Sequence, residues 1–244
     1  MKIGGHRGCG VTDSWRSIPD SPQENSAASI AQAFEQGADF VECDWVWDAQ
    51  GVGWICHSSR LTDHFEHPPA EYLDDVPSAM VSQMLGVNGH PLISLTELIE
   101  RFGSRRINLE IKGVKGVGRP RVSFLSQQYP IRWPEGWWLS SFDPLDLLEA
   151  QSVWPDVQLG LLSAEKGDLS HQYAGKTPYL SGRSALSVLA DNPGWWWHPE
   201  LTDRPPSDLH QVGWSLKPVM PQDDLTQGLD GLITDRLDAW VTTG

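Results

Sequence analysis

The strongest constraint on the fold of this 244-residue chain is a regular alternation of short apolar segments with helix signals. Such alternation is typical of βα units, whose strands form a parallel sheet. Helices are predicted directly after the capping residues Ser26, Ser94 and Asp143, because their side chains can accept hydrogen bonds from the first turn of a helix. The apolar segments predict nine strands: Lys2–Gly5, Asp39–Trp45, Gly53–His57, Ile107–Lys112, Trp137–Ser141, Val157–Leu162, Ala185–Leu189, Val212–Leu216 and Gly231–Thr234.

The third predicted strand follows the second too closely for a parallel crossover. Only residues 46–52 lie between them, whereas a crossover between parallel strands needs about a dozen residues. We therefore expect Gly53–His57 to return antiparallel, as a hairpin on the second strand. The other eight strands predict an α/β fold, a (β/α)8 TIM barrel with an antiparallel hairpin inserted after the second strand, in one domain over residues 1–244.

Charge and hydropathy narrow the range of functions. The chain has 32 acidic and 18 basic residues, a formal net charge of −14, which argues against binding to nucleic acid and to anionic membranes. No apolar run approaches the about 20 residues of a membrane-spanning helix, and the first residues lack the apolar core of a secretory signal. We expect a cytoplasmic protein without stable membrane insertion, and the sequence sets no oligomeric state.

Charged residues gather near the carboxyl ends of the predicted strands, where the active sites of such barrels lie. Glu42 and Asp44 are two residues apart, so both side chains point to one face of their strand. Glu110 and Lys112 have the same spacing. Converging carboxylates repel one another, and a hard divalent cation such as Mg2+ or Ca2+ would relieve that repulsion through oxygen ligands.

Two histidines and an arginine complete this set. His6 and Arg7 follow the first strand, and His57 ends the hairpin, which can fold back over the barrel mouth. Imidazoles can transfer protons near neutral pH, and Arg7 and Lys112 carry permanent positive charge. These residue types together suit attack on a phosphate ester. A structural network of ion pairs is the alternative interpretation.

At these residues the sequence resembles the glycerophosphodiester phosphodiesterase family. Each matching motif is weak alone, but their joint order and spacing extend over nearly the whole chain. The matches are His6-Arg7-Gly8, Pro22-Gln23-Glu24-Asn25-Ser26 with one inserted residue, the segment 37–44 (GADFVECD), the hairpin ending at His57, Glu110-Ile111-Lys112, Ser141-Phe142 and the segment 228–237 (GLDGLITDRL).

The resemblance implies a metal-dependent hydrolysis of small-molecule glycerophosphodiesters, such as glycerophosphocholine or glycerophosphoethanolamine, to sn-glycerol 3-phosphate and an alcohol. The glycerol 2-hydroxyl would attack phosphorus through a cyclic phosphate, or water would attack directly. The family's functional residues correspond here to the general base and acid His6 and His57, the ligands of Mg2+ or Ca2+ Glu42, Asp44 and Glu110, and the substrate-binding residues Arg7, Lys112 and Trp214.

Departures from the family pattern concern the substrate mouth. Ser58 follows His57 where the family usually has Asp, and a carboxylate there would orient the histidine. Lys217 replaces the Asn that usually lies three residues after Trp214. Two rival functions therefore stay open: a lysophospholipase D or sphingomyelinase D-like enzyme on the same fold, and a catalytically silent phosphodiester-binding protein.

Thirteen tryptophans are the compositional oddity of the chain. The run Trp195-Trp196-Trp197 is expected to follow the sixth strand and to lie on the catalytic face. It could pack a lid against the barrel rim, form a wall for a choline-like headgroup by cation–π contact, or dock on a lipid interface. Trp45, Trp47 and Trp54 could belong to the same wall, and a tryptophan-rich mouth would favour the lipid-cleaving alternative.

Two further segments bear on the mouth of the barrel. The glycine-rich basic segment 112–121 is expected to form a loop, in which Lys115 or Arg119 could attract an anionic substrate. His57, His64 and His67 do not have the spacing of a common closed zinc site, so we expect solvated loop histidines.

Overall fold

Strands and helices alternate along the part of the chain that the computed structural model describes, residues 1–10, 22–63, 65, 67–85, 89–112, 132–164, 180–215, 221 and 224–241. The strands are β1 (Lys2–Gly5), β2 (Phe40–Trp47), β3 (Gly53–Ile55), β4 (Ile107–Ile111), β5 (Trp138–Ser141), β6 (Gln158–Ser163), β7 (Trp196–Pro199), β8 (Val212–Gly213) and β9 (Gly231–Thr234). The α-helices are α1 (Ala27–Glu35), α2 (Ser78–Val81), α3 (Leu95–Phe102), α5 (Pro144–Val153), α6 (Gly182–Asp191) and α7 (Leu237–Trp240).

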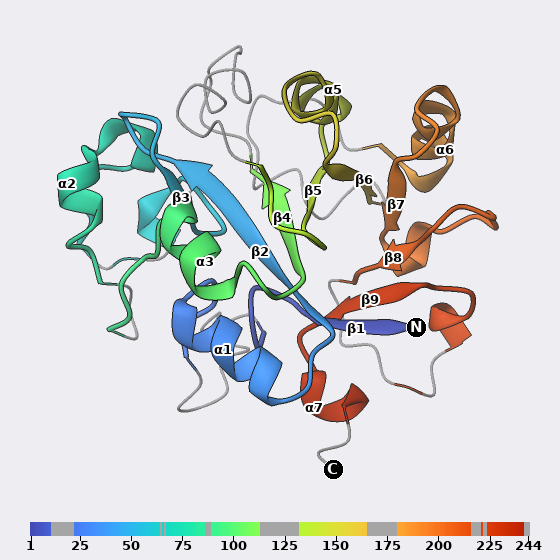
Figure 1. Ribbon diagram of the computed structural model, residues 1–244, viewed down its shortest axis with the longest axis horizontal. Coiled ribbons are helices and arrows are strands. Elements are labelled where there is room, and N and C mark those ends of the chain that lie inside the picture. Colours follow the sequence, from blue (N-terminus) through green and yellow to red (C-terminus); the bar gives the residue numbers. More distant parts are fainter. Residues whose placement is uncertain are drawn as a thin grey trace.

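Eight of the strands form a parallel sheet that nearly closes into a barrel (Figure 1), in the order β7-β6-β5-β4-β2-β1-β9-β8. The two end strands meet through backbone hydrogen bonds from Trp197 N to His210 O (2.9 Å) and from Trp214 N to Pro199 O (3.0 Å). Helices α1, α5, α6 and α7 lie outside the ring of strands. The predicted (β/α)8 barrel is therefore confirmed. None of the helices in the described segments is both long enough and apolar enough to cross a membrane.

The ninth strand, β3, pairs antiparallel with the end of β2, with Trp45 opposite Ile55. Asp48 organises the turn between them, because its carboxylate accepts hydrogen bonds from Val52 N (3.0 Å) and from Trp54 Nε1 (2.8 Å). This pairing carries the chain back along β2, and it places residue 57 close to the inner carboxylates of β2.

The segment after β3 has a small hydrophobic core of its own. It contains the 3-10 turns Leu61–Asp63 and Leu73–Asp75 and the helix α2. The buried residues of this second core are Val46, Trp54, Cys56, Leu61, Phe65, Leu73, Val76, Val81 and Met84. Because Val46 and Trp54 belong to β2 and β3, the second core packs the segment that follows β3 against this hairpin.

Two more apolar clusters belong to the barrel: the outer core, which lies between the strands and the helices, and a separate plug inside the ring of strands. In the outer core, helix residues such as Leu98 and Leu147 pack against outward-facing strand residues. The plug consists of Phe40, Trp138, Val212 and Ile233. The first three of these begin their strands, so the plug fills the amino-terminal end of the barrel and leaves the carboxyl end for polar residues.

One glycine makes room for this plug. A Cβ atom on Gly4 would lie 2.2 Å from the ring of Phe40, far inside van der Waals contact. Gly4 and Phe40 are register partners on β1 and β2. Only glycine at position 4 therefore allows Phe40 to fill the barrel.

The sixth barrel strand differs from the predicted one. Residues Ala185–Leu189, expected to form a strand, lie within α6, which Ser181 caps by accepting a hydrogen bond from Ser184 N (3.3 Å). Ala185 and Leu189 are both buried, and a spacing of four residues puts them on one face of a helix. A short apolar run is compatible with either structure, and here the helical spacing matches the burial.

The true sixth barrel strand is β7, formed by the tryptophan run itself. Trp196 points into the barrel, with its ring 5.5 Å from that of Trp138. The other tryptophans considered for an aromatic wall are buried in apolar cores: Trp45, Trp47, Trp195 and Trp197 in the outer core and Trp54 in the second core. The aromatic wall, one of three alternatives for these tryptophans, is contradicted for these five residues. The prediction that the run follows the sixth strand is wrong, because Trp196 and Trp197 form that strand.

Several expectations lie outside the described residues. These are the basic segment beyond Lys112, His64 of the histidine group, and Lys217.

Candidate active site

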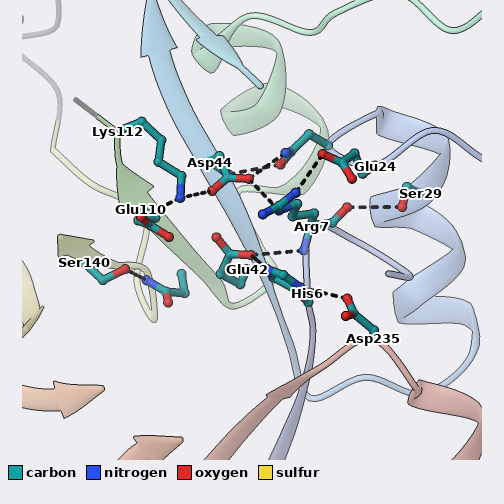
Figure 2. Close-up of polar contacts among 12 residues, drawn as sticks. His6, Arg7, Glu24, Ser29, Glu42, Asp44, Glu110, Lys112, Ser140 and Asp235 are labelled. Atoms are coloured by element: carbon teal, nitrogen blue, oxygen red, sulfur yellow. Dashed lines mark hydrogen bonds and ion pairs between the residues drawn. The ribbon is translucent and has the colours of Figure 1, made fainter. Parts of the chain in front are cut away.

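Three carboxylates converge at the carboxyl end of the barrel (Figure 2). Glu42 and Asp44 lie on β2 and Glu110 on β4, and the sheet register places Asp44 directly opposite Glu110. One oxygen of each carboxylate lies within 4.8 Å of the others. All three residues are buried, so their mutual repulsion is weakly screened by water.

Two permanent cations compensate part of this negative charge. Lys112 Nζ donates to Glu110 Oε1 at 2.6 Å and lies 3.0 Å from Asp44 Oδ1. Arg7 Nε lies 3.2 Å from Asp44 Oδ2, and its Nη1 donates to Glu24 Oε1 at 3.0 Å. Buried charges are tolerated when they are paired in this way, so each cation is held against the carboxylates rather than in solvent.

The backbone of Arg7 adopts a left-handed conformation, with φ of 51°. This region is unfavourable for residues other than glycine, and three hydrogen bonds hold the chain there. Arg7 N donates to Glu42 Oε2 (3.0 Å), and its carbonyl oxygen accepts from Asn25 N (2.8 Å) and from Ser29 Oγ (3.3 Å). The strained loop thereby directs both an N–H group and the guanidinium of Arg7 at the carboxylates.

Glu24 and Asn25 belong to the site, although they were not among the predicted site residues. Asn25 Nδ2 donates to Asp44 Oδ2 (2.8 Å), and Asn25 Oδ1 accepts from Asp44 N (3.0 Å). Asn25 therefore binds both the side chain and the backbone of Asp44. The signal was present in the sequence, because both residues lie in the Pro22–Ser26 motif.

The two predicted catalytic histidines approach the cluster from different elements. His6 follows β1, with Nδ1 2.7 Å from Asp235 Oδ1 and Nε2 3.9 Å from Glu42 Oε2. His57 follows β3 and is half-buried. Backbone pairing holds it near Asp44, because Cys56 N donates to Asp44 O at 3.0 Å.

The electrostatics of the cluster favour a further cation. Burial raises the pKa of Glu42 to about 8, and the neighbouring charge of Asp44 adds to this rise. Burial also raises the pKa of Glu110. The pKa of Asp44 is instead lowered, because Lys112 and Arg7 outweigh the opposing effect of burial. Full ionisation of the three carboxylates thus needs more positive charge than Arg7 and Lys112 supply.

The electrostatics of His6 differ. Burial acts to lower its pKa, but the adjacent Asp235 carboxylate outweighs burial, and the net pKa is raised. The imidazole is therefore held among negative groups on both sides, Asp235 at Nδ1 and Glu42 at Nε2.

The donor set fits a hard divalent cation. Glu42 Oε1 is buried and has no hydrogen-bond partner among the residues that the structure describes. Oxygens that bind one Ca2+ at about 2.3–2.6 Å lie at most about 5 Å apart, and the spread of 4.8 Å among the three carboxylate oxygens lies within this limit. Carboxylates without nitrogen or sulfur ligands are the donors that Mg2+ and Ca2+ prefer.

Trp214 lies just beyond β8 and makes different contacts. Its Nε1 donates to His198 O at 3.1 Å, and its ring meets that of Phe142 edge-on, with 5.6 Å between the centroids. The described contacts join six of the eight predicted site residues into one cluster: His6, Arg7, Glu42, Asp44, Glu110 and Lys112.

A (β/α)8 barrel that carries buried carboxylates and fixed cations at its mouth is suited to cleaving a phosphoric diester, and the chain is a phosphoric diester hydrolase by its family. It belongs to the glycerophosphoryl diester phosphodiesterase family, whose model matches residues 6–177. A comparison with curated protein sequences finds no match.

Solved structures share the fold at low sequence identity. A phosphodiesterase from Oleispira antarctica, in complex with the product sn-glycerol-3-phosphate, has a TM-score of 0.71 and 20% identity over 96% of this chain and 93% of its own. A glycerophosphodiester phosphodiesterase from Agrobacterium tumefaciens has a TM-score of 0.69 and 19% identity over 99% of both chains. One from Thermotoga maritima has a TM-score of 0.66 and 17% identity, over 99% of this chain and 97% of its own.

Proposed function

We propose that this protein is a metal-dependent glycerophosphodiester phosphodiesterase that releases sn-glycerol 3-phosphate and an alcohol. The observation that carries the proposal is the convergence of Glu42, Asp44 and Glu110 within 4.8 Å, beside Arg7 and Lys112. Family membership supports the reaction class. The sn-glycerol-3-phosphate described as the product in the Oleispira antarctica structure supports the identity of the released phosphate.

The charged residues would bind the phosphodiester group. Arg7 and Lys112 lie on two sides of the carboxylates, so their positive charges can neutralise the phosphoryl oxygens as charge develops there. A divalent cation held by Glu42, Asp44 and Glu110 would supply Lewis-acid polarisation of the same oxygens. Asn25 and Glu24 would keep Asp44 and Arg7 in place through their hydrogen bonds.

The two histidines would transfer the protons. In the route that we favour, His6 accepts the proton of the glycerol 2-hydroxyl, whose oxygen then bonds to phosphorus. The bond from phosphorus to the leaving alcohol oxygen breaks, and His57 donates a proton to that oxygen. Water then opens the cyclic phosphate with the histidines in exchanged roles, giving glycerol 3-phosphate. In the rival route, His6 activates water for direct attack.

The test is a coupled assay for glycerol 3-phosphate release. Substrates are glycerophosphocholine, glycerophosphoethanolamine and one long-chain lysophospholipid, each with Mg2+, Ca2+ or EDTA. We expect metal-dependent turnover that His6→Ala removes and that His67→Gln, which changes an exposed histidine, leaves intact. Folded wild-type protein that turns over no substrate with either metal would contradict the proposal and favour the phosphodiester-binding alternative.

Two further outcomes of this assay distinguish the remaining possibilities. A transient 1,2-cyclic glycerol phosphate in quenched reactions supports attack by the 2-hydroxyl, and its absence supports direct attack by water. Faster cleavage of the lysophospholipid than of glycerophosphocholine would support the lipid-cleaving alternative. The burial of Trp195 and Trp197 in the outer core removes the main sequence argument for that alternative.

A further inference from the structure

The end of the last barrel strand lies directly beside the first histidine of the chain. Strands β1 and β9 pair in parallel, with Gly5 opposite Thr234, and His6 N donates to Thr234 O at 3.0 Å. Asp235 directly follows Thr234, the last residue of β9, and its Oδ1 lies 2.7 Å from His6 Nδ1. Two residues at opposite ends of the chain thus form a short hydrogen bond at the rim of the carboxylate cluster (Figure 2).

We propose that Asp235 is a positioning residue for His6 in the phosphodiester reaction, an inference that rests on the proposed function. A carboxylate can only accept a hydrogen bond at Nδ1, so the proton of the neutral imidazole must sit on that nitrogen. Nε2 then carries the free electron pair. It is also the ring nitrogen on the inner side, 3.9 Å from Glu42 Oε2, where the substrate hydroxyl or water would lose its proton.

The geometry of β9 gives this carboxylate a defined place. Thr234 Oγ1 accepts a hydrogen bond from Arg236 N (3.0 Å), which turns the chain directly after the strand. The guanidinium of Arg236 is directed to Asp238, with two contacts of 2.8 Å. In the described contacts of this turn, Asp235 therefore pairs with His6, and Asp238 pairs with Arg236.

Asp238 provides a matched control for Asp235. Both are aspartates on the same turn, but the Asp238 side chain is 62% exposed and the Asp235 side chain 19%. An exposed ion pair contributes little to stability, so Asp238→Asn should leave both folding and activity close to those of the wild type.

Asp235→Asn distinguishes a positioning role from a structural one. Asparagine keeps the size of the side chain and can still hydrogen-bond His6, but its amide can donate to Nδ1 and then moves the imidazole proton to Nε2. We expect kcat for a glycerophosphodiester to fall by at least about 10-fold with KM changed by less than about 3-fold, because a catalytic histidine held in the wrong tautomer loses kcat rather than substrate binding. Asp235→Glu, which keeps the acceptor, should recover part of kcat.

The imidazole tautomer gives a readout that does not need turnover. In 15N-labelled protein, at a pH high enough that the His6 imidazole is neutral, the imidazole nitrogen shifts should place the His6 proton on Nδ1 in the wild type and in Asp238→Asn, and away from Nδ1 in Asp235→Asn. A wild-type His6 with its proton on Nε2 overturns the proposal, and so does Asp235→Asn with kcat within about 2-fold of wild type. If the wild type binds metal but cleaves no phosphodiester, the proposed function fails while the tautomer still decides whether Asp235 orients His6.

Discussion

The imidazole of His198 should make the protein less stable in mild acid. This side chain lies on β7 inside the barrel and is 0% exposed, and neither ring nitrogen has a hydrogen-bond partner in the described segments of the chain. Burial, reinforced by the positive charge of His210, lowers the pKa of His198 from 6.5 to about 3. The folded protein therefore keeps His198 neutral where an unfolded chain protonates it.

The sign and size of the effect follow from proton binding. Between pH 6.5 and about pH 3 the unfolded state binds more protons at this residue than the folded state, so the free energy of unfolding decreases as the pH falls through that window. From pH 7.5 to 5.5, only about one pH unit lies below the unfolded pKa. At about 1.4 kcal/mol per unit, His198 alone should remove about 1.4 kcal/mol of stability over this interval.

The assay is urea unfolding followed by fluorescence at pH 7.5 and 5.5. His198→Leu keeps a similar side-chain volume and removes the titrating group, so its loss of stability between the two pH values should be smaller than that of the wild type by about 1.4 kcal/mol. His67→Gln, which changes an exposed histidine, is the control and should behave as the wild type does. Equal losses in His198→Leu and the wild type, within about 0.5 kcal/mol, would refute the reasoning.

Three further predictions concern the site and the barrel. Glu42→Gln removes one of three converging charges and should weaken Mg2+ or Ca2+ binding at least about 10-fold by calorimetry; unchanged affinity would place the ion elsewhere. Gly160→Ala puts a Cβ atom 2.5 Å from His198 Nε2 and should lower the free energy of unfolding by about 1–3 kcal/mol; added His198→Ala should recover part of it, and no loss in the single variant would contradict the packing. EDTA should abolish turnover and Mg2+ or Ca2+ restore it, whereas activity that persists in EDTA argues against a metal.

Much of the barrel could be predicted because local patterns are strong in this chain. Ser94 predicted a helix directly after it, and α3 begins at the next residue, Leu95, with Ser94 as its cap. The last strand was predicted as Gly231–Thr234, and β9 has these bounds. Short-range rules suffice where caps, glycines and periodicity agree on one structure.

The prediction failed where the local pattern was ambiguous. Ala185–Leu189 is a short apolar run without a strong period, and Trp196–Pro199 contains bulky residues that suit either a strand or a lid. The choice between them depends on which segment finds a neighbour in the sheet. Leu161 pairs with Trp197, and this contact spans residues that no local rule relates.

The candidate site also combines features that the sequence predicts with features that depend on tertiary contacts. Spacing alone put Glu42 and Asp44 on one face of their strand, because side chains alternate along any strand. Glu24 and Asn25 instead reach Arg7 and Asp44 through hydrogen bonds between residues 17 and 19 positions apart in the chain. The left-handed backbone at Arg7 is likewise accompanied by hydrogen bonds to the distant residues Glu42 and Ser29, which no local sequence pattern specifies.

By itself, the sequence determined the eight-strand barrel, the inward carboxylates and the order of the motifs, since these depend on periodicity and on the lengths of connections. Only the tertiary structure decided which segment completes the barrel and which groups touch. The pair His6 and Asp235 illustrates the reason. The two residues are separated by 229 positions in the chain, and they meet because closure of the barrel sets β1 beside β9 in a register that local interactions do not specify.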